Sequence, residues 1–270
     1  MKRKTKRLKW LIYFSTFFLF VTTAEAEITV NQNYLNIEKL SEHSMDLIRN
    51  AKILFGHMSV GINTLNGLGD LASQNEKYEL TITQVFSAND FNSPKLGHFF
   101  LGGNKDPIGK LSRFSDKIRN TYGQNIQIAI FKFCPLDINR DTNVATLFNT
   151  YKNTMSSLKS AYPNIIFVHS TCPLSVGDEL SNIKRGQFNN WMLNEYNGKE
   201  YIFDIAAIES AYPDGRKAAF TSSGQTYYKL CPEYTTDGIH LNDPSNQGRQ
   251  RAAKGMLYLL ADIVQTHSLN

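Results

Sequence analysis

Apolar positions fall into two alternating patterns from about residue 50 onward. Short runs rich in Ile, Val and Phe lie at Lys52 to Phe55, Leu80 to Val85, Ile126 to Phe133, Ile165 to His169 and Tyr201 to Ile205. Short, nearly continuous apolar runs are typical of strands that are buried on both faces of a parallel sheet. The pattern therefore predicts five mostly parallel strands.

Longer amphipathic segments separate these runs. They predict helices at Val60 to Gln74, Ile108 to Tyr122, Val144 to Tyr162, Asn182 to Tyr196 and Asn246 to Thr266. In the last segment Ala253, Met256 and Leu260 repeat at helical spacing, and Ser245 is the expected N-cap. Strands that alternate with helices favour an α/β fold with helices on both faces of the sheet.

Two segments interrupt the alternation. The first runs from Phe86 to Pro107 and contains three glycines and two prolines, and the second runs from Ala211 to Thr236 and is rich in tyrosine. We expect a loop in the first and a hairpin or a lid in the second. Both leave from the carboxyl ends of predicted strands, where open parallel sheets bind their ligands, so both are candidates for function.

The first 26 residues have a different pattern. Basic residues gather between Lys2 and Lys9, an apolar stretch runs from Trp10 to Thr23, and Ala24-Glu25-Ala26 fits the rule for signal-peptide cleavage. We therefore expect a signal peptide over residues 1–26, one domain over residues 27–270, and a periplasmic or secreted protein. The apolar stretch is shorter than the roughly 20 residues of a membrane span. No stable span is expected after cleavage, and an uncleaved anchor is the alternative.

Charge argues against a nucleic-acid-binding protein. Six of the 29 Lys and Arg residues and one of the 24 Asp and Glu residues lie in the first 26 positions, which leaves 23 of each in the rest. The excess of basic residues therefore belongs to the predicted targeting segment and not to a binding face.

The three cysteines, Cys134, Cys172 and Cys231, show no metal-ligand spacing. An oxidising compartment would permit one disulfide, whose pairing the sequence does not define, and buried free thiols are the alternative. Cys134 and Cys172 each follow a strand, and those two strands are expected to be neighbours. We predict no metal and no other cofactor.

The strongest candidate for chemistry is the tetrad Asp237-Gly238-Ile239-His240, which precedes the last predicted helix. An acid three residues before a histidine can supply the orienting carboxylate and the general base of a serine hydrolase. Ser59 follows the first predicted strand and directly precedes a helix, where free backbone N–H groups can hold an oxyanion. The expected strand order would bring Ser59 to the same sheet edge as the tetrad. The alternatives are that Ser59 only caps its helix and that His240 is a solvated loop residue.

These residues resemble the SGNH (GDSL-like) hydrolases, a family of esterases and acyl-transferring enzymes. The resemblance covers the mature chain by element order but only its two ends by motif. It implies a flavodoxin-like three-layer α/β/α sandwich with a five-stranded sheet. It also implies Ser59 as the nucleophile, His240 as the base and Asp237 as the group that orients the imidazole.

The first family motif is altered here. In place of Gly-Asp-Ser the chain has Gly56-His57-Met58-Ser59, which leaves His57 either as a group that contacts substrate or as a structural residue. The resemblance implies a glycine donor to the oxyanion after the second strand, for which Gly103 is the candidate. The family's Gly-x-Asn-Asp pattern is missing after the third strand. Asn104 is the substitute that we consider, against a plain turn role.

The remaining candidates have simpler explanations. His169 and Asp204, near strand ends, are expected to be structural hydrogen-bonding residues. Tyrosines of the second interrupting segment, Tyr212, Tyr227, Tyr228 and Tyr234, suit either a carbohydrate platform or the packing of a loop.

The sequence therefore predicts an exported serine esterase or acetyltransferase that acts on a small acyl ester, with an acylated cell-envelope or extracellular glycan as the favoured substrate. A non-catalytic glycan-binding protein on a degenerate scaffold is the rival from another class. A thiol-dependent enzyme that uses Cys134 or Cys172 is a third alternative.

Overall fold

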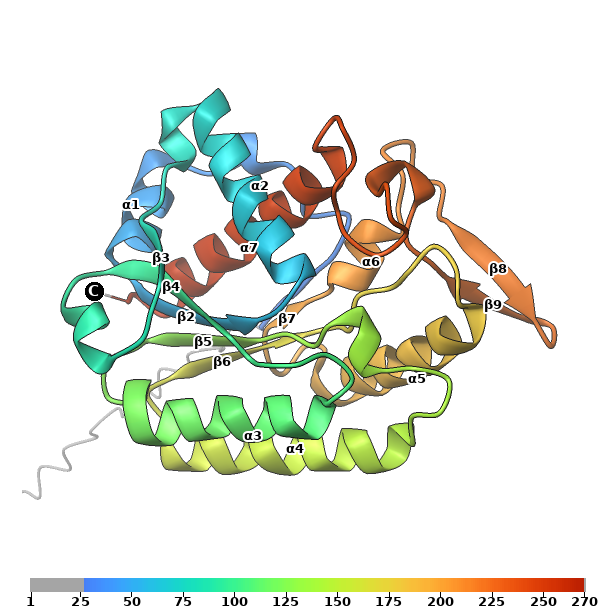
Figure 1. The fold of residues 1–270 in the computed structure, drawn as a ribbon. Coiled ribbons are helices and arrows are strands. Elements are labelled where there is room, and N and C mark those ends of the chain that lie inside the picture. The colour runs from blue at the N-terminus through green and yellow to red at the C-terminus, as the bar shows by residue number, and fades with distance from the viewer. Residues whose placement is uncertain (1–26, 270) are drawn as a thin grey trace, which may run out of the picture.

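A seven-stranded, wholly parallel sheet forms the centre of the molecule (Figure 1). The computed structural model describes residues 27–269, so the predicted signal peptide lies outside the described residues. The strands are β1 (Thr29–Val30), β2 (Lys52–His57), β3 (Ile82–Gln84), β4 (Lys95–Phe100), β5 (Ile128–Phe131), β6 (Ile166–Ser170) and β7 (Ile202–Phe203). The predicted α/β class and the parallel sheet are confirmed, but the sheet has seven strands rather than five.

The order of the strands in space is β1-β7-β6-β5-β2-β4-β3. Without the two edge strands β1 and β3, the inner five have the flavodoxin-like order, in which the chain passes from β2 to β4 on one side and then returns to β5 on the other. This change of direction occurs at the carboxyl end of β2. In such sheets a ligand crevice forms outside the strands at that point.

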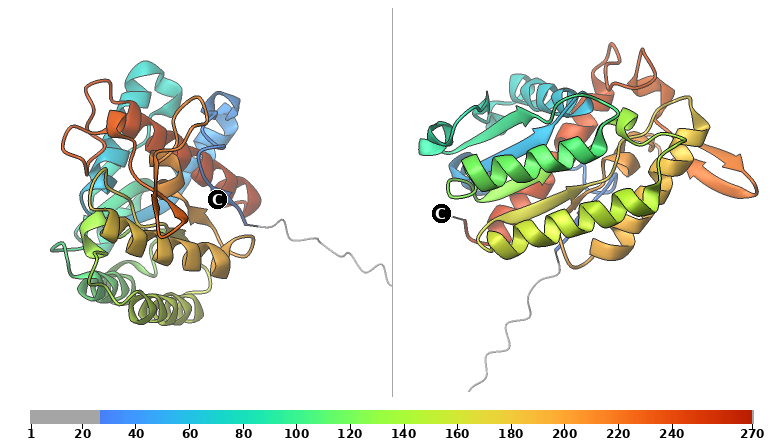
Figure 2. Two further views of the ribbon diagram at one scale, coloured as in Figure 1. Left: turned by 90° about the vertical axis from the view of Figure 1, so that its right-hand side faces the viewer. Right: turned by 60° about the horizontal axis from the view of Figure 1, so that its bottom comes forward.

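Helices cover both faces of the sheet (Figures 1 and 2). They are α1 (Glu42–Asn50), α2 (Val60–Gln74), α3 (Pro107–Lys117), α4 (Val144–Ala161), α5 (Glu179–Tyr196), α6 (Ile205–Glu209) and α7 (Gln247–Thr266). A π turn (Ile118–Tyr122) continues α3, and short 3₁₀ turns lie at Ile37–Lys39, Glu76–Tyr78, Ala88–Asn92, Pro135–Asp137 and Pro232–Tyr234. Side chains of β2 alternate between two cores: Ile53 and Phe55 face α1, α2 and α7, whereas Leu54 faces α3, α4 and α5. No helix within residues 27–269 has both the length and the apolar character that a membrane crossing requires.

Helix boundaries differ from the sequence expectation where caps decide them. Helix α5 begins three residues earlier than predicted because the Asp178 side chain caps it. The prediction that Ser245 caps α7 is wrong. Asn246 holds the N-cap position without a side-chain bond, and Asp243 accepts hydrogen bonds from the N–H groups of Gln247 and Gly248 instead.

The segment from Phe86 to Pro107, expected to be irregular, contains the inner strand β4. The predicted strand from Leu80 to Val85 is reduced to the short edge strand β3. Gly97 interrupts the apolar pattern of β4, and this glycine is required by packing because a Cβ there would lie 2.5 Å from a ring carbon of Phe91. The short elements β1, α1 and α6 were also not predicted from the sequence.

The second interrupting segment forms a hairpin, as one of the two alternatives predicted. Strands β8 (Ala219–Ser222) and β9 (Gln225–Tyr228) pair antiparallel and extend away from the sheet (Figure 2). Ser223 and Gly224 join them, both with positive φ, which matches the twist of a tight two-residue hairpin turn.

Helices α2 and α7 approach each other closely at Gly67, where a Cβ would overlap the backbone oxygen of Arg249. We expect Gly67→Ala to lower the free energy of unfolding by about 1–3 kcal/mol because the helices must separate. Gly69→Ala is the matched control on the same helix, since nothing lies within 4 Å of its added methyl. That change should leave stability equal or raise it by up to about 1 kcal/mol. Urea unfolding measures both, and equal effects of the two changes would contradict the close approach.

Candidate active site

Ser59 occupies a strained turn between β2 and α2. Strand β2 ends at His57 and α2 begins at Val60, so the chain reverses within two residues. Ser59 has φ +50° and ψ −109°, a conformation that non-glycine residues rarely adopt and that typically costs about 1–3 kcal/mol. Strain of this kind is maintained mostly at functional positions, and a serine on a sharp strand-to-helix turn presents its hydroxyl at the sheet edge.

The side chain of Ser59 does not cap α2. It makes no capping hydrogen bond although it stands at the N-cap position. Within residues 27–269 neither its hydroxyl nor its backbone N–H has a hydrogen-bond partner, whereas its carbonyl accepts from Ile62 at 2.8 Å. The capping interpretation of Ser59 is therefore wrong, and both its hydroxyl and its N–H are available to a substrate.

Asp237 and His240 form a hydrogen-bonded pair. Nδ1 of His240 lies 2.7 Å from Oδ2 of Asp237, and the other carboxylate oxygen accepts from the N–H groups of Ile239 and His240. Gly238 has φ +79°, which lets the tetrad turn this tightly. The imidazole is thus held by one nitrogen, and its Nε2 has no partner within the described residues.

The charge state of Asp237 is set by these contacts. Partial burial alone would raise its pKa, but the hydrogen bonds from the His240 N–H, the His240 ring and the Ile239 N–H outweigh it and hold the pKa well below its usual range. Asn242, which the sequence did not single out, also donates from Nδ2 to Oδ2 of Asp237 at 3.1 Å. The carboxylate is therefore ionised and fixed, as a group that orients a catalytic imidazole must be.

Contacts between the two ends of the chain bring the tetrad to α2. The N–H of Leu241, next to His240, donates to Oδ1 of Asn63 at 3.3 Å, and Asn63 lies one turn beyond Ser59. Farther along α2, Oδ2 of Asp70 forms an ion pair with Nε of Arg249, in α7, at 2.6 Å. The described structure contains no direct hydrogen bond between Ser59 and His240. Catalytic hydrogen bonds are often long without substrate and shorten in the complex.

The loop after β4 runs beside the Ser59 turn. The N–H of Leu101 donates to the His57 carbonyl at 3.1 Å, which extends the pairing of β4 with β2 up to this turn. Gly102 and Gly103 follow, and nothing lies within 4 Å of a Cβ placed on Gly103. Open space therefore surrounds Gly103, the candidate oxyanion donor, on the side where a side chain would stand.

Asn104 is bound through its carbonyl oxygen, which accepts from Nζ of Lys110 at 3.0 Å. Its amide nitrogen, the group that an oxyanion contact needs, makes no hydrogen bond within the described residues. The oxyanion role of Asn104 stays a prediction, and the bond to Lys110 explains how the side chain is oriented.

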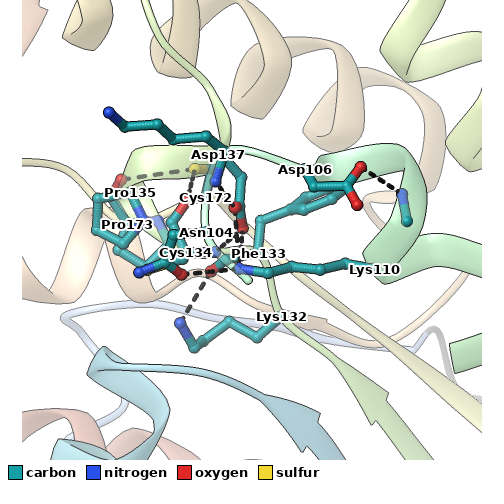
Figure 3. A network of polar contacts seen from close by, with 12 residues as sticks. Asn104, Asp106, Lys110, Lys132, Phe133, Cys134, Pro135, Asp137, Cys172 and Pro173 are labelled. Atoms are coloured by element: carbon teal, nitrogen blue, oxygen red, sulfur yellow. Dashed lines mark hydrogen bonds and ion pairs between the residues drawn. The ribbon is translucent and has the colours of Figure 1, made fainter. Parts of the chain in front are cut away.

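Asp137 joins the loops on both sides of β2 (Figure 3). Its carboxylate accepts from Nζ of Lys110 at 2.7 Å, from the N–H of Cys134 at 2.6 Å and from the N–H of Lys105 at 3.0 Å. Asp137 lies in the loop after β5, where the family would carry Gly-x-Asn-Asp. The buried ion pair of Lys110 and Asp137 thus supports the Gly102–Asn104 loop, since Lys110 also bonds Asn104 and Asp137 also bonds Lys105. The sequence signals only the burial of Lys110, which shares the apolar face of its helix with Phe114, and not its partner Asp137.

Breaking this pair should cost much stability. Both side chains are essentially inaccessible to solvent, and Lys110→Met would leave the Asp137 carboxylate buried without its cation. We expect the free energy of unfolding to fall by about 3–5 kcal/mol. Lys152→Met, which breaks a half-exposed pair with Glu195 on another part of the surface, is the control and should cost far less. Urea denaturation of both variants gives the comparison, and similar losses would contradict a special role for the buried pair.

His57 lies in the interior rather than at the surface of the site. Its ring is fully buried, its Nε2 faces Nδ1 of His98 at 3.1 Å, and Gly61 packs directly against it. Burial, with the nearby Lys132 and His98, lowers the pKa of His57 to about 2, so the ring stays neutral. These contacts support the structural alternative, with His57 supporting the turn from beneath.

The three cysteines are free and buried. Strands β5 and β6 are neighbours, as expected, and Sγ of Cys172 lies 3.6 Å from the Cys134 carbonyl oxygen. Burial raises the pKa of Cys172 far above its usual value and that of Cys231 to about 12. Since the thiolate is the nucleophilic form, these surroundings do not favour a thiol-dependent enzyme.

His169 and Asp204 lie in hydrogen-bonded positions, as predicted for structural residues. His169 bonds the Tyr151 hydroxyl at 2.7 Å and Glu200 at 2.8 Å, and Asp204 caps α6. Among residues 27–269 no three His, Cys, Asp or Glu side chains are grouped as a metal site would require.

Comparisons with known proteins identify structural neighbours only. No protein-family model and no curated protein matches the chain. One solved structure similar to it is a proposed acylhydrolase from Bacteroides fragilis, at 13% identity and a TM-score of 0.48, covering 88% of this chain and 99% of that one. Another is a proposed lipolytic protein of the G-D-S-L family from Desulfitobacterium hafniense, at 13% identity and a TM-score of 0.46, covering 78% and 99%.

Proposed function

We propose that this protein is an exported serine esterase or acyltransferase that acts on a small acyl ester, such as an acetyl group on a cell-envelope or extracellular glycan. The observation that carries the proposal is the unpartnered Ser59 hydroxyl on a strained turn, beside a loop in which Asp237 orients His240. This arrangement supplies a nucleophile, a base and an orienting acid from three positions.

In this mechanism Nε2 of His240 takes the proton of the Ser59 hydroxyl while its oxygen attacks the ester carbonyl. The carboxylate of Asp237 stabilises the imidazolium that results. Backbone N–H groups of Ser59 and Gly103 donate to the oxyanion, and His240 then returns the proton to the leaving alcohol. Water resolves the acyl-enzyme in a hydrolase, whereas a sugar hydroxyl resolves it in a transferase.

Hydrolysis of p-nitrophenyl esters of increasing chain length tests the proposal. The acetate should be turned over and the octanoate poorly, because an acyl pocket for acetate must be small. The same protein incubated with O-acetylated xylan should release acetate. No hydrolysis of any of these esters would remove the proposed function.

One observation favours the rival, a glycan-binding protein without catalysis. In the loop after β5 the side chain of Asp137 is fully used in hydrogen bonds to Lys110, Cys134 and Lys105. The same loop also lacks the Gly-x-Asn-Asp pattern, so no residue in it is assigned as the family's asparagine donor. Retained binding of polysaccharide by a protein that hydrolyses no ester would favour this rival.

A further inference from the structure

A cavity lies beneath the β8–β9 hairpin, between β9, α5 and α6. Its volume is about 260 Å³, and Asp204, Lys217 and Tyr228 are among the residues that line it. Pockets for drug-sized ligands are typically about 300–1,000 Å³. The cavity therefore suits one small ring rather than an extended molecule.

Asp204 gives the cavity a hydrogen-bond acceptor. The residue is only 7% exposed, and one carboxylate oxygen, Oδ1, accepts from the Thr171 hydroxyl at 3.0 Å and from the Ala207 N–H at 3.1 Å. The other oxygen, Oδ2, accepts no hydrogen bond within the described residues. Because Oδ2 is not among the buried polar atoms that lack a partner, it is open to the cavity, where it can accept a hydrogen bond from a ligand.

Lys217 and Tyr228 add a hydrogen-bond donor and an aromatic ring to the lining of the cavity. Nζ of Lys217 lies 5.0 Å from the centroid of the Tyr228 ring, and Tyr228 is 47% exposed. The Lys217 ammonium also acts on Asp204, since it opposes the rise in the pKa of Asp204 that burial causes. One cation and one anion together do not favour a charged ligand. They favour a neutral molecule whose hydroxyls both donate and accept.

The loop over residues 174–176 connects the cavity to the tetrad. Leu174 lines the cavity, and two residues later the N–H of Val176 donates to the carbonyl of Gly238, inside the tetrad, at 2.9 Å. The same loop receives the end of the hairpin, because the N–H of Leu230 donates to the Ser175 carbonyl at 3.2 Å. A polymer bound in the cavity is therefore separated from the candidate triad by a single loop.

We propose that this cavity binds one neutral sugar residue, held by hydrogen bonds from its hydroxyls to Oδ2 of Asp204, by donation from Lys217 and by contact with the Tyr228 ring. Of the four tyrosines considered as a carbohydrate platform, Tyr234 is fully buried, whereas Tyr227 and Tyr228 line the cavity. The inference rests on the proposed function in one respect: the bound sugar is a unit of the acylated glycan, next to the unit that is deacylated.

Saturation-transfer NMR with methyl glucoside, methyl galactoside and N-acetylglucosamine tests the site, using the full chain carrying Ser59→Ala. At least one sugar should bind, and Asp204→Asn should weaken its binding by about tenfold or more, because the amide keeps the Oδ1 contacts but replaces the free acceptor with a donor. Tyr228→Ala, a change at a half-exposed ring, should also weaken binding. Phe86→Ala removes a more exposed ring from another part of the surface and should not.

Absence of binding by all three sugars, or equal affinity in Tyr228→Ala and Phe86→Ala, would overturn the site. If the Asp204→Asn variant does not fold, sugar binding by Lys217→Met and Tyr228→Ala tests the site instead, and both should bind more weakly than the parent. Sugar binding by a protein that hydrolyses no ester would leave the cavity assigned and remove the proposed function. Ester hydrolysis without sugar binding would keep the proposed function and overturn the assignment of the cavity.

Discussion

Ser59→Ala is expected to lower kcat for p-nitrophenyl acetate by at least about 10³-fold, because removal of the nucleophile leaves only the oxyanion contacts and binding. The mutation also removes no hydrogen bond that holds the fold, since the Ser59 hydroxyl has no partner within residues 27–269. Thermal unfolding of the variant should therefore match that of the parent. Steady-state kinetics on both proteins measures the effect.

Ser73→Ala is the matched control for this prediction. Ser73 lies on the same helix, and its hydroxyl donates to the carbonyl of Gly69 at 2.9 Å. Its loss should leave kcat within about twofold of the parent, since a surface substitution away from the site has a small effect. If Ser59→Ala and Ser73→Ala retained equal activity, Ser59 would have no part in the chemistry.

Asp237→Asn is expected to lower kcat by about 10⁴-fold, the scale of loss when an orienting carboxylate becomes an amide. The amide would no longer stabilise an imidazolium at His240. Its NH₂ group would also donate toward Nδ1 and so favour the tautomer that cannot accept the serine proton. Oδ1 can still accept the hydrogen bonds from the backbone N–H groups of Ile239 and His240, so the turn itself should survive.

The control for Asp237→Asn is Asp214→Asn, which alters an exposed carboxylate paired with Arg216. Kinetics should not change in that variant, and circular dichroism should show both variants folded. An Asp237→Asn protein with parental kcat would mean that His240 is not oriented for catalysis by this carboxylate.

Much of the scaffold could be predicted because its signals are local. The apolar run of β2 and the amphipathic pattern of α2 placed both elements within two residues of their observed bounds, and the position of Ser59 between them followed. The tetrad was recognisable for the same reason, since Asp237 and His240 lie three residues apart and need only one turn to meet.

What could not be predicted depends on contacts between distant residues. The side chain of Phe91 packs where a Cβ of residue 97 would stand, so β4 requires a glycine there. This glycine interrupts the apolar run by which a buried strand is recognised in a sequence. The brace of Lys110 and Asp137 joins a helix to a loop 27 positions away. The strained backbone of Ser59 and the position of Asp204 in the wall of a cavity are properties of the folded chain, which no residue pattern reports.

The most direct test of a Ser59 nucleophile is covalent labelling with a fluorophosphonate, followed by mass-spectrometric mapping of the modified peptide. The geometry predicts one adduct, on the peptide that contains Ser59, and its loss in His240→Ala because the base no longer activates the hydroxyl. Labelling of another residue, or labelling of Ser59 that persists unchanged without His240, would contradict the proposed triad.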